Sequence, residues 1–133
     1  ENWDMLHDYL DAAESLRWKK VKNMGEGILQ YKRNLIKSLL KNSYITNILG
    51  NEVPIVNAPF FQSEMAGELA EGMPFAAAYY YDGNGYKFSL RSRDNGKDVS
   101  KVAAAFGGGG HRNASGFRVV DMSSLKYGVN NEE

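Results

Sequence analysis

Four consecutive glycines, Gly107 to Gly110, followed at once by His111, are the residues here whose types and spacing point most clearly to chemistry. Glycine loses more backbone entropy on folding than any other residue and adds no side chain to a core, so packing does not explain such a run. Successive glycine N–H groups can turn toward one concavity and bind an anion. Histidine adds a donor whose charge changes near neutral pH. The run therefore predicts a phosphate-binding loop.

The charge around the glycine run supports an anion site. The chain of 133 residues has 16 Lys and Arg against 16 Asp and Glu, so its formal net charge is zero. Residues 87–118, however, contain seven basic residues against two aspartates, a net charge of +5. A basic block of this kind attracts anions, whereas the zero total argues against tight, sequence-independent binding to long duplexes, which needs many phosphate contacts.

Several kinds of functional site are excluded by the sequence around the run. A P-loop has Lys-Ser or Lys-Thr after its last glycine, but here Gly110 is followed by His111 and Arg112. A dinucleotide-binding motif opens a helix with its glycines, whereas these glycines follow a predicted helix. The chain has two histidines and no cysteine, so the sequence supports neither a metal cluster nor a covalent nucleophile.

The alternative to an anion site is a flexible loop with an incidental histidine. Flexible linkers are rich in serine and flanked by polar residues, but this run lies between Phe106 and Phe117 and is followed by small residues at positions 114–116. The flanking residues favour the anion site.

The elements that must position the run follow from hydrophobic periodicity. Residues 4–42 are predicted to form two helices, or one helix that breaks near Gly25 and Gly27. Two short strands are expected at 44–49 and 52–56 around a Gly-Asn turn, and Pro54 favours an edge position or no strand at all.

The second half of the chain alternates strands and helices. A helix is predicted after Pro59, a hairpin at 75–81 and 86–93, a helix at 98–106 and a last strand at 117–120. In the second hairpin strand, Lys87, Ser89, Arg91 and Arg93 share one face. This order predicts an α/β fold with a mixed β-sheet of about five strands flanked by helices and preceded by an N-terminal helical linker. We assign residues 1–43 to the linker helices, 44–122 to the α/β domain and 123–133 to a tail.

Three segments resemble the C-terminal DHH-associated domain of the DHH phosphoesterases. Residues 108–116 resemble its Gly-Gly-Gly-His-x-x-Ala-x-Gly signature, residues 88–92 its Ser-Leu-Arg-Ser strand, and residues 98–103 its Asp-Val-Ser helix. Their order and spacing are those of this family, which includes RecJ-like exonucleases, nano-RNases, nucleotide phosphatases and exopolyphosphatase-related proteins. Upstream the resemblance is weaker.

The resemblance implies a division of labour between two domains. The C-terminal domain is similar to a lid that holds the phosphate end of the substrate, while a separate N-terminal domain supplies aspartates, the Asp-His-His motif and two manganese ions, Mn(II). Asp-His-His is absent from these 133 residues. We therefore expect this chain to bind no metal and to hydrolyse nothing by itself, and expect metal-assisted hydrolysis by the parent protein.

Carried over residue by residue, the resemblance implies that Arg91 and His111 contact phosphate, helped by backbone amides of the glycine run. The planar fork of arginine can hold two phosphate oxygens. Alternatively, Arg91 faces water and His111 is a buried histidine bonded to backbone. Ser115 departs from the family, which more often has alanine there. The complete set of expected substrate-binding residues is Ser89, Arg91, Gly108, Gly109, Gly110, His111 and Asn113.

The expected partners are a phosphate ester, a nucleotide or a short single-stranded nucleic acid, and a DHH catalytic domain in the same parent protein. One alternative is a stand-alone nucleic-acid-binding module without catalysis, in which tyrosines at 79–81 and 86 stack on bases. A homodimer through the N-terminal helices is another alternative. Residue 1 is glutamate rather than methionine, which fits a processed product or a part of a longer protein. Without a recognisable membrane segment or signal peptide, the expected location is cytoplasmic.

Overall fold

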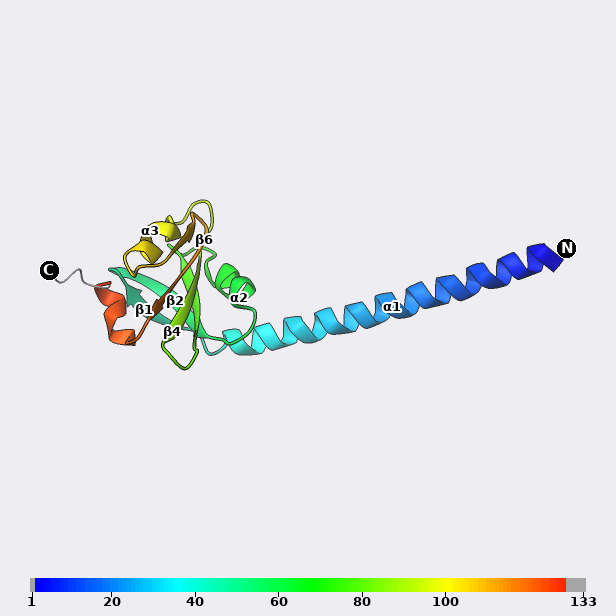
Figure 1. The fold of residues 1–133 in the computed structure, drawn as a ribbon, viewed down its shortest axis with the longest axis horizontal. Coiled ribbons are helices and arrows are strands. Elements are labelled where there is room, and N and C mark those ends of the chain that lie inside the picture. Colours follow the sequence, from blue (N-terminus) through cyan, green and yellow to red (C-terminus); the bar gives the residue numbers. More distant parts are fainter. Residues whose placement is uncertain (1, 129–133) are drawn as a thin grey trace. The chain divides into compact units, whose positions relative to one another are not determined.

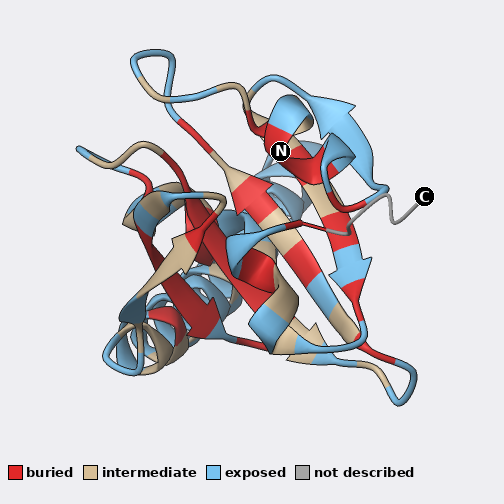
Figure 2. Cartoon of the chain, turned by 90° about the vertical axis from the view of Figure 1, so that its left-hand side faces the viewer, coloured by how far each residue is buried: buried red, intermediate tan, exposed pale blue. Residues whose placement is uncertain are grey.

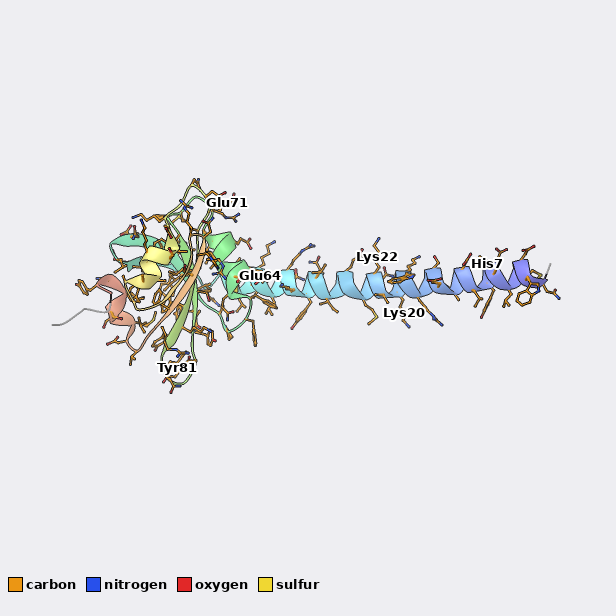
Figure 3. The ribbon with its side chains drawn as sticks, turned by 45° about the horizontal axis from the view of Figure 1, so that its top comes forward. His7, Lys20, Lys22, Glu64, Glu71 and Tyr81 are labelled. Atoms are coloured by element: carbon orange, nitrogen blue, oxygen red, sulfur yellow. The ribbon has the colours of Figure 1, made fainter. Side chains whose placement is uncertain are left out.

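A computed structural model describes residues 2–128, and the chain divides into two compact units, residues 1–37 and 38–133. The N-terminal part is one continuous helix, α1 (Asn2–Leu40), so the predicted break near Gly25 and Gly27 is wrong. Glycine keeps both backbone hydrogen-bonding groups and lowers helix stability by only about 1 kcal/mol per residue. Figure 3 shows the side chains along α1 and labels His7. The Nδ1 atom of His7 lies 3.2 Å from Oδ2 of Asp11, one helical turn further along.

Within residues 2–128, the second unit contains a mixed sheet of six strands in the order β1-β2-β3-β4-β6-β5. Figure 1 labels β1, β2, β4 and β6 of this sheet. Among the strand pairs of the described part of the chain, only β2 and β3 are parallel. The α/β fold with a mixed sheet and flanking helices is thus confirmed, with six strands instead of about five, because the glycine run itself contributes β5. The strands are β1 (Tyr44–Ile48), β2 (Asn51–Asn57), β3 (Ala76–Tyr81), β4 (Tyr86–Arg91), β5 (Gly109–His111) and β6 (Ala114–Val119).

Pro54 is buried and lies in β2, an inner strand between β1 and β3. The expectation that Pro54 lies in an edge strand or in no strand is therefore wrong. The pairing register explains the exception. On one side Pro54 is opposite Ile45 of β1, but on the other side pairing with β3 starts only at Ile55, opposite Ala77. The missing N–H of proline therefore interrupts no bond between β2 and β3.

Two short helices pack on the sheet. Helix α2 (Gln62–Leu69) contacts β2, β3 and β4, whereas α3 (Val99–Ala104) contacts β4, β5 and β6. The main core cluster joins α3 to one face of the sheet, and buried residues are coloured red in Figure 2. The buried Met65 and Ala66 of α2 are not part of that cluster. None of the helices within residues 2–128 is long and apolar enough to cross a membrane.

A row of stacked aromatic rings runs through this core beneath the glycine run. The ring centroids of Phe106 and Phe117 are 4.2 Å apart, those of Phe117 and Phe88 4.8 Å, and those of Phe88 and Tyr79 5.2 Å. The phenylalanines that bracket the glycines in sequence therefore contact each other directly. They fix the end of α3 to the middle of the sheet.

The predicted tail contains part of a 3-10 helix, η1 (Met122–Lys126). Leu125 of η1 is buried in the core, and its carbonyl accepts a hydrogen bond of 2.9 Å from the N–H of Leu49. Residues 129–133 of the predicted tail lie outside the described residues.

Aspartates begin two of these short elements and fold the hairpin between β3 and β4. Asp98 accepts bonds from the N–H and the hydroxyl of Ser100 at the start of α3, 3.0 and 2.5 Å long, and these bonds lower the pKa of its carboxyl group. Hydrogen bonds from Ser123 lower the pKa of Asp121, which precedes η1. The pKa of Asp82 is lowered mainly by the hydrogen bond from the N–H of Asn84 and, to a smaller extent, by the charge of Arg118.

These lowered pKa values predict acid sensitivity. A carboxyl group whose pKa is lower in the folded state stabilises the fold above its unfolded pKa, about 3.9 for Asp, and loses this effect as pH falls through the folded value. We expect the melting temperature, measured by circular dichroism, to fall between pH 6 and pH 3. The variant Asp98→Asn keeps an acceptor for Ser100 but cannot titrate, so its decrease should be smaller. Equal decreases in both proteins would contradict this assignment.

Candidate functional site

An open groove of about 440 Å³ lies on the face of β4, β6 and β5 opposite the main core. Two segments that are distant in sequence form it: the basic strand β4 and the hairpin made by β5 and β6. Its lining residues are Lys87, Phe88, Ser89, Arg91, Gly109, Gly110, Ala114, Ser115, Gly116, Phe117 and Arg118.

Strand pairing arranges the side chains of the groove face in rows. Directly opposite residues of neighbouring antiparallel strands point to the same face of the sheet. Successive rows on that face follow each other two residues apart along each strand. The rows are Arg91–Ala114–His111, Ser89–Gly116–Gly109 and Lys87–Arg118.

The middle of the groove is formed by small residues. Ala114 and Gly116 of β6 lie between the polar residues of β4 and the edge strand β5. A β-carbon added to Gly109 would meet no atom within 4 Å, whereas one added to Gly116 would lie 2.9 Å from the carbonyl oxygen of Phe88. The floor is therefore backbone that a ligand can approach closely.

Three of the four glycines are required by the fold itself. Gly107 has a φ of +80° after α3, where the N–H groups of Gly107 and Gly108 donate to the carbonyls of Ala104 and Ala103 in a helix-ending turn. A β-carbon on Gly108 would lie 2.1 Å from the Gly116 oxygen, and one on Gly110, whose φ is +147°, 2.6 Å from the Ala114 oxygen. The expectation that packing does not explain the run is thus wrong for Gly108 and Gly110, whereas Gly107 is required by its backbone angle and not by packing. Only Gly109 has no such requirement.

Arg91 is half-buried and lies between the groove and α2. Its Nη2 donates to the Ser63 hydroxyl at 2.5 Å and its Nη1 to the Leu90 carbonyl at 2.7 Å. Arg93, two residues further, donates to the Gly67 carbonyl at 2.8 Å and does not line the groove. The alternative that Arg91 simply faces water does not describe its position.

His111 and Asn113 are not among the residues that line the groove. His111 is exposed, so it is not the buried histidine of the alternative interpretation; its register places it in the row of Arg91. The side-chain amide of Asn113 donates to Asp94 at 2.9 Å and accepts from Arg112 at 3.1 Å, which ties the β5–β6 turn to the loop after β4.

Ser115, the departure from the family pattern, has a local role. Its hydroxyl donates to the carbonyl of His111 at 2.7 Å, across the turn between β5 and β6. The added hydroxyl therefore fixes the end of the edge strand.

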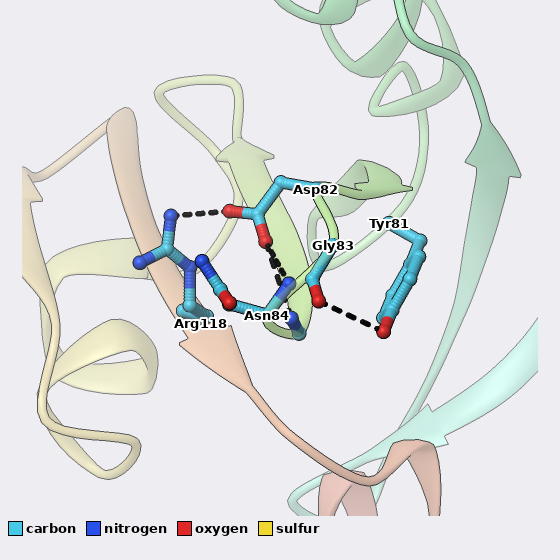
Figure 4. A network of polar contacts seen from close by, with 6 residues as sticks. Tyr81, Asp82, Gly83, Asn84 and Arg118 are labelled. Carbon is cyan, nitrogen blue, oxygen red and sulfur yellow. Dashed lines mark hydrogen bonds and ion pairs between the residues drawn. The ribbon is translucent and has the colours of Figure 1, made fainter.

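Two basic residues of the groove were not among the expected site residues. Lys87 lies on the basic face that strand alternation predicts, and Arg118 lies directly opposite it on β6. Arg118 forms an ion pair with Asp82, whose carboxylate also accepts from the N–H groups of Asn84 and Gly85 at 3.0 and 3.1 Å (Figure 4). The alternation of β4 was the signal that could have found Lys87.

The tyrosines considered for base stacking lie on different faces of the sheet. Tyr79 is buried in the core, and burial raises the pKa of its hydroxyl, which lies 2.8 Å from that of Tyr44. Tyr86 packs against the same core. Tyr80 alone of the four is opposite Lys87 and therefore faces the groove side.

Within residues 2–128, no group of three or more His, Asp and Glu side chains is close enough to hold a metal ion. The His, Asp and Glu side chains of residues 2–128 therefore do not fit the manganese centre that the resemblance implies for the catalytic domain of the DHH phosphoesterases. No step of metal chemistry is therefore assigned to them.

Comparison with known proteins finds one matching family model and one similar curated protein. Residues 63–128 match the family model described as the DHHA1 domain. An uncharacterized protein of Acanthamoeba polyphaga mimivirus is 37% identical over 106 residues, which cover 73% of this chain and 25% of that protein. This chain thus spans about a quarter of the length of that relative.

Two solved structures are also similar. An uncharacterized protein from Helicobacter pylori G27 matches with a TM-score of 0.46 and 26% identity, over 56% of this chain and 22% of the other. A pGpG-specific phosphodiesterase from Vibrio cholerae matches with a TM-score of 0.49 and 10% identity, over 68% of this chain and 34% of the other.

Proposed function

This chain belongs to the DHHA1 domain family through its residues 63–128, and from that membership we propose that it is the substrate-binding part of a phosphoesterase of the DHH family. The groove on β4, β6 and β5 would bind the phosphate group of a phosphate ester, a nucleotide or a short single-stranded nucleic acid. The observation that carries the proposal is the position of Arg91, which lines the same groove as Gly109 and Gly110.

Arg91 is suited to a phosphate because a guanidinium group can donate two parallel bonds to its oxygens. Its bond to Ser63 holds the side chain beside the groove before any ligand arrives, which lowers the entropy lost on binding. His111, across Ala114 in the same row, would donate from the opposite side.

The glycines would act through their backbone. The N–H of Gly108 already donates to Ala103. Because alternate N–H groups of the edge strand β5 donate to β6, one of Gly109 and Gly110 would supply the amide donor to the ligand. Asn113, whose side chain is bonded to Asp94 and Arg112, would position the β5–β6 turn.

Hydrolysis would be the task of a DHH catalytic domain in the parent protein, with two Mn(II) ions bound there. By binding the substrate, this domain would position the scissile phosphate relative to the catalytic domain. Such positioning contributes to the reaction rate although no residue of this domain takes part in the reaction. The stand-alone chain would then bind without hydrolysing.

The test is calorimetric titration of the chain with a 5'-phosphorylated oligonucleotide. We expect Arg91→Ala to weaken binding at least about tenfold, as expected for loss of a charge-assisted contact worth about 1.5–3 kcal/mol. Arg91→Lys should recover only part of the affinity, because an ammonium group cannot donate bidentately. Affinity should also fall with salt, since phosphate contacts release counterions.

The matched control is Arg93→Ala, which removes the same charge two residues later, beyond the end of β4, from a residue that does not line the groove. It should leave the affinity within about twofold, as expected for an exposed charge that does not contact the ligand. If both alanine variants bind as the unaltered chain does, the proposed function is wrong.

A further inference from the structure

At the end of the groove away from Arg91, Lys87 and Arg118 lie directly opposite each other across β4 and β6. We propose that this pair, named here the second anion subsite, binds a second phosphate group of a short oligonucleotide whose first phosphate lies at Arg91. The proposal rests on the proposed function of the groove and specifies the class of its ligand.

The electrostatics of the pair carry the first step. Two like charges directly opposite each other destabilise an antiparallel sheet. The ion pair with Asp82 offsets the charge of Arg118 (Figure 4). Within residues 2–128 Lys87 has no ion pair with an acidic side chain, and it is exposed. An anion between the two side chains would neutralise this excess positive charge.

The spacing carries the second step. Lys87 and Arg91 are four residues apart on β4 and face the same side of the sheet. At 3.2–3.4 Å per residue their Cα atoms are separated by about 13 Å. One phosphate group does not span this distance, and neither do two adjacent backbone phosphates, whereas the extended backbone of a trinucleotide with three phosphates does. Ser89 and Gly116, the row between the two ends, leave a passage without large side chains.

An aromatic neighbour of Lys87 favours a nucleic acid over a polyphosphate as the ligand. Tyr80 of β3 is the cross-strand partner of Lys87 and is only partly buried. Bases stack on exposed aromatic rings in single-stranded nucleic acid binding sites, with a contribution of about 1–3 kcal/mol per base. A polyphosphate would gain nothing from this ring.

The test compares three ligands by calorimetry: a nucleoside 5'-monophosphate, a 5'-phosphorylated trinucleotide of the same base, and inorganic tripolyphosphate. For Lys87→Ala we expect about tenfold weaker binding of the trinucleotide, a salt slope reduced by about one, and an affinity for the monophosphate that is unchanged within twofold. Lys87→Gln, which keeps a long polar side chain, should behave in the same way. Lys126 lies outside the groove, so Lys126→Ala should change neither the affinity for the trinucleotide nor that for the monophosphate.

Tyr80→Leu should weaken the binding of the trinucleotide but not the binding of tripolyphosphate. If Lys87→Ala weakens the trinucleotide and the monophosphate equally, or neither, the second subsite is wrong while the proposed function stands. If Tyr80→Leu leaves the trinucleotide unaffected, the assignment to an oligonucleotide is wrong. If none of the three ligands binds the unaltered chain, the proposed function itself fails.

Discussion

Replacing Phe117 with alanine is expected to lower the free energy of unfolding by about 3–5 kcal/mol. The ring of Phe117 lies between those of Phe106 and Phe88, at centroid distances of 4.2 and 4.8 Å, and the residue is only 5% exposed. Its removal would leave a cavity between α3 and the sheet. Because small domains have a total stability of about 5–15 kcal/mol, the variant should be partly unfolded at room temperature. Urea denaturation followed by circular dichroism measures the change.

The matched control is Phe60→Ala, since Phe60 is 62% exposed and its truncation should change the unfolding free energy by no more than about 0.5 kcal/mol. A loss below about 1 kcal/mol for Phe117→Ala would show that the row of stacked rings does not hold α3 to the sheet.

Gly108→Ala is expected to destabilise the chain by about 3 kcal/mol or more, at the upper end of the cost of overpacking. The new β-carbon would lie 2.1 Å from the backbone oxygen of Gly116 and 2.7 Å from the β-carbon of Phe117. Neither atom can move without displacing β6. The unfolding free energy, again from urea denaturation, measures the effect.

Gly109→Ala is the matched substitution one residue later. Nothing lies within 4 Å of its new β-carbon, and its φ is not in the left-handed region, so we expect a change in unfolding free energy within about 1 kcal/mol. Because Gly109 lines the groove, the same variant should bind the phosphorylated oligonucleotide more weakly. Equal destabilisation by the two substitutions would contradict the separation of structural and binding glycines.

Local patterns predicted the elements that carry strong turn or capping signals. The hairpin around Asp82 follows from its Asp-Gly-Asn-Gly sequence, and the start of α3 from Asp98, whose carboxylate caps the helix. In both cases the physical cause acts between residues that are neighbours in sequence.

Features that depend on distant contacts could not be predicted in this way. The strand β5 exists because Gly109–His111 pairs with β6, and Pro54 is tolerated inside the sheet because pairing with β3 starts one residue later. The continuity of α1 through Gly25 and Gly27 was missed because two glycines weaken a helix without ending it.

In the candidate site, too, some features could be predicted from local sequence patterns, whereas others depend on contacts between distant residues. Alternation along β4 placed Ser89 and Arg91 on one basic face, and both line the groove. The different roles of Gly108 and Gly109 could be told apart only from the carbonyl of Gly116, which comes from another strand. The bonds of Asn113 to Asp94 likewise depend on the fold.

The most direct test of the central claim is an NMR titration of the 15N-labelled chain with a 5'-phosphorylated oligonucleotide and with the same oligonucleotide lacking the phosphate. We predict that the phosphorylated ligand shifts the amide signals of Ser89, Gly109 and Gly116 most, and that the other ligand shifts them much less. Equal shifts with both ligands, or shifts confined to α3 and η1 on the opposite face, would contradict phosphate binding in this groove.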